Sequence, residues 1–105
     1  MRHTFPRLRF DEDEIIEPAG PALDHEIDRR VFQHEDAGDA APYSSGYEAS
    51  LLLEYALSRS GWLMDFASEG PYWVKLERGD ECVTATGETV ELALCRAALK
   101  AVQAA

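Results

Sequence analysis

Apolar side chains recur at helical spacing in the first third of the chain. Leu23, Ile27 and Val31 follow one another at four-residue steps, and Phe32 widens the stripe, so a helix is predicted to begin near Ala22. The acidic residues of this segment are expected on other faces of the helix: Asp24, Glu26 and Asp28. Residues 35–42 lose the periodicity and contain a glycine and a proline, which predicts a loop.

A second helix is predicted between Ser45 and Gly61. Ser45 and Glu48 have the spacing of a capping box, in which each side chain satisfies an unpaired backbone donor of the first turn. Apolar residues surround most of this helix: Tyr47, Leu51, Leu52, Leu53, Tyr55, Ala56 and Leu57. A helix with so broad an apolar face must be heavily covered, so we expect it to be the central packing helix.

Three segments with strand periodicity follow, separated by turn sequences at residues 68–71 and 78–80. The first covers residues 62–67, and the third runs from about Glu81 to Ala85. In the middle segment the side chains alternate between two faces, with Tyr72, Val74 and Leu76 on one and Trp73, Lys75 and Glu77 on the other. The short loops indicate antiparallel neighbours in a sheet covered on one side.

The last predicted helix follows Gly87 and is rich in alanine. Leu92, Cys95, Leu99 and Val102 recur at three- and four-residue steps, and alanines at positions 93, 97, 98 and 101 allow a sheet to approach closely. The expected fold is therefore α+β, a three-stranded antiparallel sheet packed with helices in the order α-α-β-β-β-α. Residues 22–105 are expected to form this one domain.

Residues 1–21 differ from the rest in composition. The first ten are basic and apolar, and they are followed by Asp11, Glu12, Asp13 and Glu14 and then by Pro18, Gly20 and Pro21. This composition predicts an extended, charged arm rather than a helix.

Several short motifs resemble the phage ABA-sandwich family of small phage and prophage proteins. They are Leu23-Asp24 with Val31-Phe32, Pro42-Tyr43-Ser44, and Thr89, Ala93 and the run from Cys95 to Val102. The resemblance covers residues 22–102 and implies the fold and a phage origin. It implies no activity, because the family has no established biochemical role.

The helix-strand-strand-strand-helix order from Tyr47 to Val102 also resembles double-stranded-RNA-binding domains. Those domains contact phosphates through lysines at the start of their final helix, where this chain has Glu88 and Glu91. With 20 acidic and 10 basic residues, the chain carries a formal net charge of −10. Direct binding of nucleic acid or of an anionic membrane is therefore not expected, and a basic protein surface is the expected partner.

The sequence offers no catalytic constellation, so we expect neither an enzyme nor a cofactor. His25 and His34 lie nine residues apart, which places them on opposite sides of a helix and argues against a metal site. The two cysteines, Cys82 and Cys95, are expected to be buried and reduced. No secretion signal or membrane-spanning run is recognisable, so a cytoplasmic location in a bacterial host cell is expected.

The residues predicted to bind a partner are the acidic ones of the arm and of the first loop, together with one aromatic side chain. They are Asp11, Glu12, Asp13, Glu14, Glu17, Glu35, Asp36, Asp39 and Trp73. Closely spaced carboxylates can imitate the phosphates of a nucleic acid and occupy a basic channel. The alternative for the acidic residues is a solvated tail, which has the same composition. For Trp73 the alternatives are an interface anchor or a side chain covered by the arm or by the first helix.

Two function classes follow from these observations. The first is a phage-encoded binding protein that inhibits a nucleic-acid-handling defence complex of the host, such as a CRISPR effector, through its acidic surface. The second is a structural or self-assembling accessory protein of the phage, whose sheet edge or Trp73 face pairs with another copy, as in a homodimer.

Overall fold

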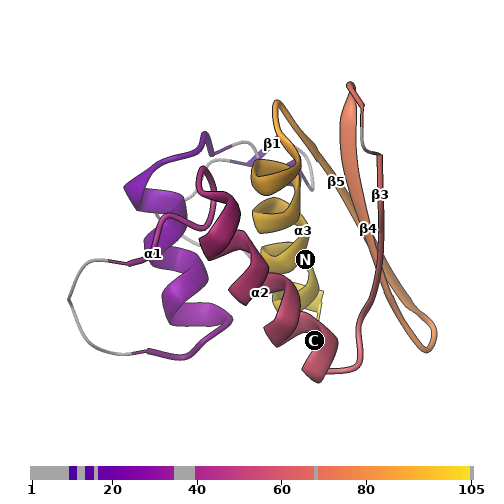
Figure 1. Ribbon diagram of the computed structural model, residues 1–105. Helices are drawn as coiled ribbons and strands as arrows, with labels where there is room; N and C mark the ends of the chain where they lie inside the picture. Colours follow the sequence, from indigo (N-terminus) through magenta and orange to yellow (C-terminus); the bar gives the residue numbers. More distant parts are fainter. Residues whose placement is uncertain (1–9, 12–13, 16, 35–39, 68, 105) are drawn as a thin grey trace.

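The computed structural model describes residues 10–11, 14–15, 17–34, 40–67 and 69–104, as Figure 1 shows. Along the chain lie β1 (Phe10–Asp11), β2 (Glu14–Ile15), α1 (Pro21–Arg30), α2 (Tyr47–Arg59), β3 (Leu63–Phe66), β4 (Tyr72–Arg78), β5 (Glu81–Gly87) and α3 (Val90–Ala104). The predicted order α-α-β-β-β-α is confirmed. A short antiparallel pair, β1 with β2, lies within the predicted arm.

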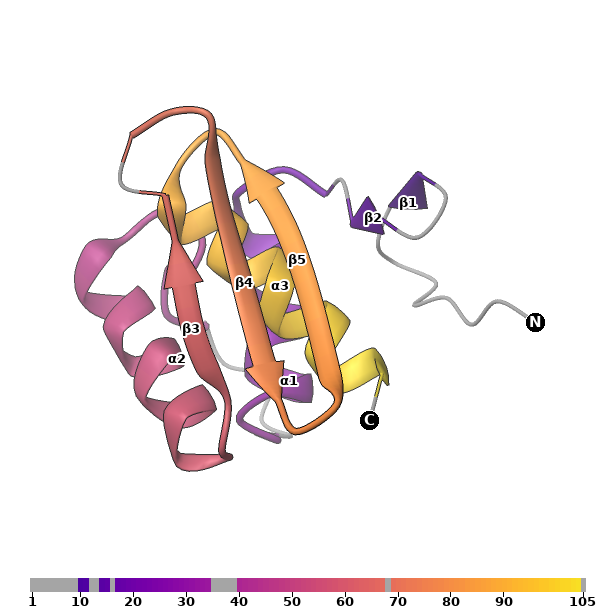
Figure 2. The same ribbon diagram turned by 90° about the vertical axis from the view of Figure 1, so that its right-hand side faces the viewer.

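The three-stranded sheet has the strand order β3-β4-β5, and both pairings are antiparallel. Val74, Leu76 and Ala85 lie on its inner face and are buried, as the alternation in β4 predicted. The helices all lie behind this face in Figure 2, and no described element lies in front of the outer face. The sheet is thus covered on one side only within the described part of the chain.

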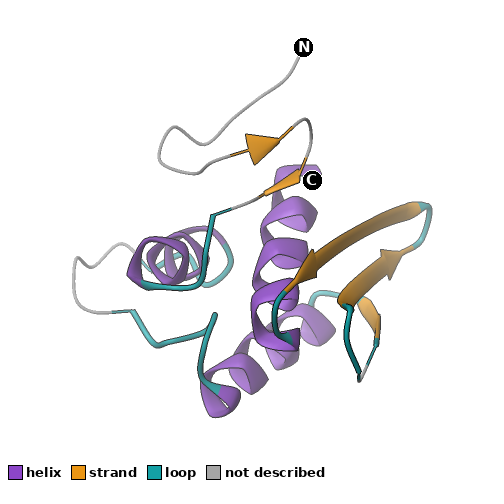
Figure 3. Ribbon diagram, turned by 90° about the horizontal axis from the view of Figure 1, so that it is seen from above, coloured by secondary structure: helices purple, strands orange, loops and turns teal. Residues whose placement is uncertain are grey.

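The central element of the fold is α3, which lies between the sheet and α1 in Figures 1 and 3. It contacts β4, β5, α1 and α2. Its buried residues extend around most of the helix: Leu92, Ala93, Leu94, Cys95, Ala97, Ala98, Leu99 and Ala101. The alanines allow close approach on several sides, and β5 comes so near at Gly87 that an added Cβ would lie 2.8 Å from the Ala93 nitrogen.

The expectation that the second helix is the central one is wrong. On α2 only Ala49, Ser50, Leu53 and Leu57 are buried. Tyr47 is 67% exposed, Tyr55 63% and Leu52 57%. Because α3 already covers the inner face of β4 and β5, α2 packs through one stripe, and most of its other large apolar side chains remain exposed.

The predicted capping box is also absent. The residue before α2 is Gly46, and no side chain caps the helix start. Ser45 belongs instead to a turn in which the Pro42 carbonyl accepts the backbone N–H groups of Ser45 at 3.2 Å and Gly46 at 2.7 Å. The predicted end of the helix is confirmed, since Ser60 follows its last residue and Gly61 has a φ of 95°.

Hydrogen bonds, one of them fully buried, connect the segment before α2 to α1 and to the residue that precedes it. The Ser44 N–H donates to Asp24 Oδ1 at 2.8 Å, and Ser44 Oγ accepts the Gly20 N–H at 3.0 Å. The Tyr43 hydroxyl donates to Asp28 Oδ1 at 3.0 Å. The prediction that the acidic residues of α1 avoid its buried faces is therefore wrong for Asp24, which is 6% exposed, because a buried backbone donor needs its carboxylate.

Truncation of one leucine in α3 and one in α2 tests which helix is central. Leu99→Ala is expected to lower the free energy of unfolding by about 2–5 kcal/mol, because it removes a fully buried side chain. Leu52→Ala is expected to change it by about 0.5 kcal/mol or less. Urea unfolding followed by circular dichroism measures both, and equal losses would contradict the packing described above.

Tyr43 gives the fold a specific sensitivity to alkali. Burial, followed by the hydrogen bond to Asp28 and its charge, raises the pKa of Tyr43 from 10.0 to about 12. Because the folded-state pKa is the higher one, this contribution to stability is complete below pH 10 and is lost as the pH rises from 10 to 12. We expect Tyr43→Phe to be less stable than the parent at pH 8, with a difference that shrinks by pH 11.5.

Urea unfolding of both proteins between pH 8 and 11.5 measures this difference. Phe at position 43 keeps the stacking against Phe32, whose ring centroid lies 5.1 Å away, so the comparison isolates the hydroxyl. A stability difference that stays constant over this pH range would contradict the assignment.

Candidate protein-binding surface

The structure exposes a group of large apolar side chains on two neighbouring elements. They are Tyr47, Leu51, Leu52 and Tyr55 of α2 and Phe66 of β3, each between 42% and 67% exposed. We call these five residues the α2–β3 surface. Leu63 is also exposed, but it pairs with Glu77 and lies on the outer face of the sheet. Aromatic and large aliphatic side chains gathered in this way are typical of protein-protein interfaces.

The α2–β3 surface is hollowed in two places. A groove of about 410 Å³ separates α2 from β3, with Tyr47 and Leu51 on its helical side and Met64 and Phe66 on its strand side. Leu94 of α3 also lines it. A second hollow of about 610 Å³ lies on the other flank of α2, where Leu52 and Ala49 face Pro42. Side chains from a partner could therefore insert on both flanks of the helix.

Carboxylates lie along both hollows. Glu54 and Glu91 line the groove and Glu48 lines the second hollow, whereas neither lining includes a lysine or arginine. The nearest cation described on α2 is Arg59, whose guanidinium lies 5.8 Å from the centre of the Tyr55 ring. An apolar segment with positive charges at its flanks would match this pattern.

The predicted acidic site divides between described and undescribed residues. Asp11 and Glu14 are register partners in the β1–β2 pairing. The Glu17 carbonyl accepts hydrogen bonds from the Arg96 guanidinium at 3.1 and 3.3 Å. Glu12, Asp13, Glu35, Asp36 and Asp39 lie outside the described residues. The β1–β2 pair lies on the β5 side of the sheet in Figure 2, away from the α2–β3 surface.

Trp73 is half-buried and lies on the outer face of β4, where it pairs with Thr86 of β5. α1 does not cover it, because α1 lies on the other side of α3. Its assignment as a partner-binding residue remains a prediction. Cys82 lies on the same outer face and is exposed, which corrects the expectation that both thiols are buried.

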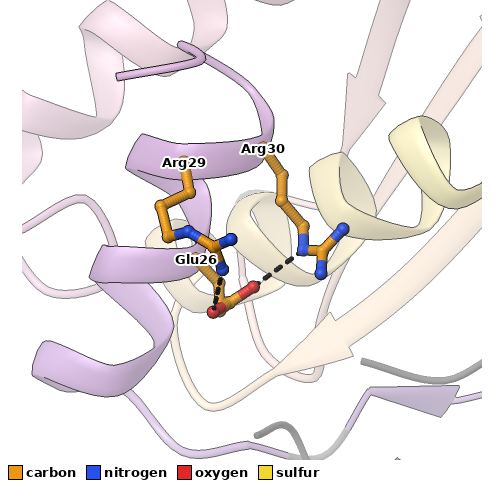
Figure 4. Close-up of polar contacts among 3 residues, drawn as sticks. All are labelled: Glu26, Arg29 and Arg30. Carbon is orange, nitrogen blue, oxygen red and sulfur yellow. Dashed lines mark hydrogen bonds and ion pairs between the residues drawn. The ribbon is translucent and has the colours of Figure 1, made fainter. Parts of the chain in front are cut away.

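Two ionisable side chains away from the α2–β3 surface, Glu26 and Cys95, are buried. Glu26 is 2% exposed, and its carboxylate accepts hydrogen bonds from Arg29 Nη1 at 3.2 Å and Arg30 Nε at 2.8 Å, as Figure 4 shows. This pairing explains how a second acidic residue of α1 can be buried, against the sequence expectation. Burial, with the negative charges of Asp24 and Glu91, raises the pKa of the Cys95 thiol, which is therefore a poor nucleophile.

The α2–β3 surface is not among the predicted sites, because a broad apolar face on a helix indicates burial when only the sequence is considered. One signal distinguishes the two helices. Alanines at positions 93, 97, 98 and 101 give α3 small side chains, and it has no tyrosine, whereas α2 contains Tyr47 and Tyr55 among its leucines. Tyrosine is enriched at protein interfaces, because its ring provides apolar contact area and its hydroxyl can remain hydrogen-bonded.

Comparison with known proteins supports the fold. No protein-family model matches the chain, and no curated protein matches its sequence. Among solved structures, a phage protein from Bacillus cereus ATCC 14579 has the same fold, with a TM-score of 0.69 and 18% sequence identity. The match covers 79% of this chain and 86% of that one. Membership of the ABA-sandwich family itself remains a prediction.

The described residues contain no group of three or more histidine, cysteine, aspartate or glutamate side chains that could hold a metal ion. No helix among them is long and apolar enough to cross a membrane.

Proposed function

We propose that this chain is a phage-encoded binding protein without enzymatic activity, and that its α2–β3 surface docks on a protein of the bacterial host. The observation that carries the proposal is the exposure of five large apolar side chains, four of which line two hollows: Tyr47, Leu51, Leu52 and Phe66. Exposing such groups to water is unfavourable, and a binding function accounts for their retention. The fold shared with a phage protein supports a phage origin.

Charge narrows the class of partner. With a net charge of −10, the protein attracts basic surfaces over long distances and repels nucleic acids. Proteins that handle nucleic acids have basic channels, so we propose that the partner is such a complex in the host cytoplasm. Inhibition of a host defence complex, such as a CRISPR effector, is the specific activity proposed.

The two candidate regions would contribute in different ways. The acidic residues of the arm provide long-range attraction, which added salt screens. The α2–β3 surface provides apolar contact area, which salt does not weaken in this way. Because the β1–β2 pair and the α2–β3 surface lie at opposite edges of the sheet, their contributions can be altered separately.

Self-assembly is the second candidate function. The outer sheet face is uncovered in the described part of the chain, and it presents Trp73 and Leu63. Another copy could pack on this face, as expected of a structural accessory protein of the phage. Such a protein would have a multiple of the monomer mass in solution at all salt concentrations.

Capture from a bacterial lysate tests the proposed function. The tagged protein is incubated at low salt, eluted with rising salt, and its partners are identified by mass spectrometry. Leu52→Asp and Tyr55→Asp are each expected to weaken binding of the recovered complex at least about tenfold, because each places a charge in a contact. Replacing Asp11, Glu12, Asp13 and Glu14 with amides is expected to reduce the salt dependence instead.

Thr84→Asp is the matched control, because it adds the same charge to an exposed position on the opposite edge strand. It should bind like the parent. Recovery of the bait alone, as an oligomer, would favour the self-assembling accessory protein. If the two α2 variants bind the recovered complex like the parent, the α2–β3 surface is not the docking site.

A further inference from the structure

The two edges of the sheet differ in how their backbone groups are satisfied. At the outer edge of β5, the Thr84 carbonyl accepts a hydrogen bond from Lys100 Nζ at 2.6 Å, and the Thr86 carbonyl accepts one from Arg96 Nη1 at 3.0 Å. Both donors come from α3. Long basic side chains placed in this way prevent another strand from pairing with β5.

The outer edge of β3 lacks this protection among the described residues. The Ala67 N–H donates to the Trp73 carbonyl at 3.1 Å, and hydrogen-bonded positions alternate along an antiparallel pair. The backbone groups of Met64 and Phe66 therefore point away from β4. The Phe66 N–H donates to Asp65 Oδ1 at 2.9 Å, while no described residue bonds the outward N–H of Met64.

This edge borders the groove of the α2–β3 surface. Met64 and Phe66, whose backbone groups point outward, also contribute side chains to the groove, opposite Tyr47 and Leu51. In Figure 2, α2 lies beside β3 along this edge. A chain paired with β3 would thus have ladder hydrogen bonds on one side and apolar pockets for its alternate side chains.

We propose that the partner contributes an extended segment that adds to β3 as a fourth strand and fills the groove with alternate apolar side chains. The proposal rests on the proposed function and specifies how the partner is recognised. The carboxylates of Glu54 and Glu91 line the groove, so lysine or arginine residues flanking the apolar ones complete the match. The preferred ligand is an apolar and basic peptide in extended conformation.

Two other occupants fit less well. A helix has already used its backbone hydrogen bonds internally and cannot pair with the outward groups of Met64. A second copy would bring another net charge of −10 and another set of groove carboxylates to the same place. Like charges on paired strands are unfavourable.

A random decapeptide library displayed on phage and selected on the full-length protein tests the proposal. We expect the enriched peptides to carry apolar residues at every second position and lysine or arginine between them. One enriched peptide is then synthesised in two forms, with backbone N-methyl groups on the odd-numbered or on the even-numbered residues. The form whose methylated amides face β3 should bind at least about tenfold more weakly than the unmethylated peptide. The other form should bind within about twofold of the unmethylated peptide.

Variants at Met64 test the same contact from the protein side. Met64→Pro removes the outward N–H and should abolish peptide binding. Met64→Ala removes a side chain of the groove but keeps the N–H, so it should weaken binding less than the proline variant does. Circular dichroism establishes that both are folded. The methylated peptides give the answer on the unmodified protein if the proline variant does not fold.

Strand addition is overturned if no alternating peptides are enriched, if the enriched ones have helical spacing, or if methylation in both registers is tolerated. Strand addition by a partner is also overturned if the free protein is a dimer and Met64→Pro dissociates that dimer. A second copy of the chain would then occupy the outer edge of β3. The proposed function has a separate test. Leu52→Asp and Tyr55→Asp should weaken binding of a partner at the α2–β3 surface whether the partner segment is a strand, a helix or a loop.

Discussion

The burial of α3 is the constraint on which the rest of the structure depends. This helix contacts β4 and β5 on one side and α1 and α2 on others, and Cys95, Ala97 and Leu99 are fully buried. Small side chains are needed for such close approach, and Gly87 permits β5 to pass within contact distance of the helix backbone. With about 25 cal/mol gained per Å² of apolar surface removed from water, this helix contributes much of the hydrophobic stability.

The central position of α3 determines which surfaces are left uncovered. Because α3 occupies the inner face of β4 and β5, α2 contacts the remainder of the core through one stripe and presents its other apolar residues outward. The side chains of Lys100 and Arg96 reach from α3 to the β5 edge and satisfy its carbonyls. The opposite edge, at β3, borders the apolar groove. Among the described residues, the unpaired strand edge and the apolar groove therefore lie together, at the β3 edge of the domain.

The sequence predicts the local structure well and the distribution of burial less well. Turn residues and the alternation in β4 identify the strands, because both signals are short-range. Hydrophobic periodicity does not distinguish which of two apolar helices lies at the centre of the domain. It identifies the apolar face of each helix, but not the elements that pack against that face. Asp24 can be buried because the Ser44 N–H, distant in sequence, donates a hydrogen bond to its carboxylate. Glu26 can be buried because Arg29 and Arg30, which follow it in the same helix, pair with its carboxylate. Of the predicted acidic site, five residues lie outside the described part of the chain.

Hydrogen exchange of individual backbone amides, measured with and without a bound partner segment, shows whether the β3 edge binds the partner. Exchange at the outward Met64 amide is expected to slow at least about tenfold on binding, as a new ladder hydrogen bond would require. The Thr84 and Thr86 amides at the opposite edge should exchange at unchanged rates. Slowing at β5 or in the β1–β2 pair, with Met64 unaffected, would contradict the assignment of the α2–β3 surface as the binding site.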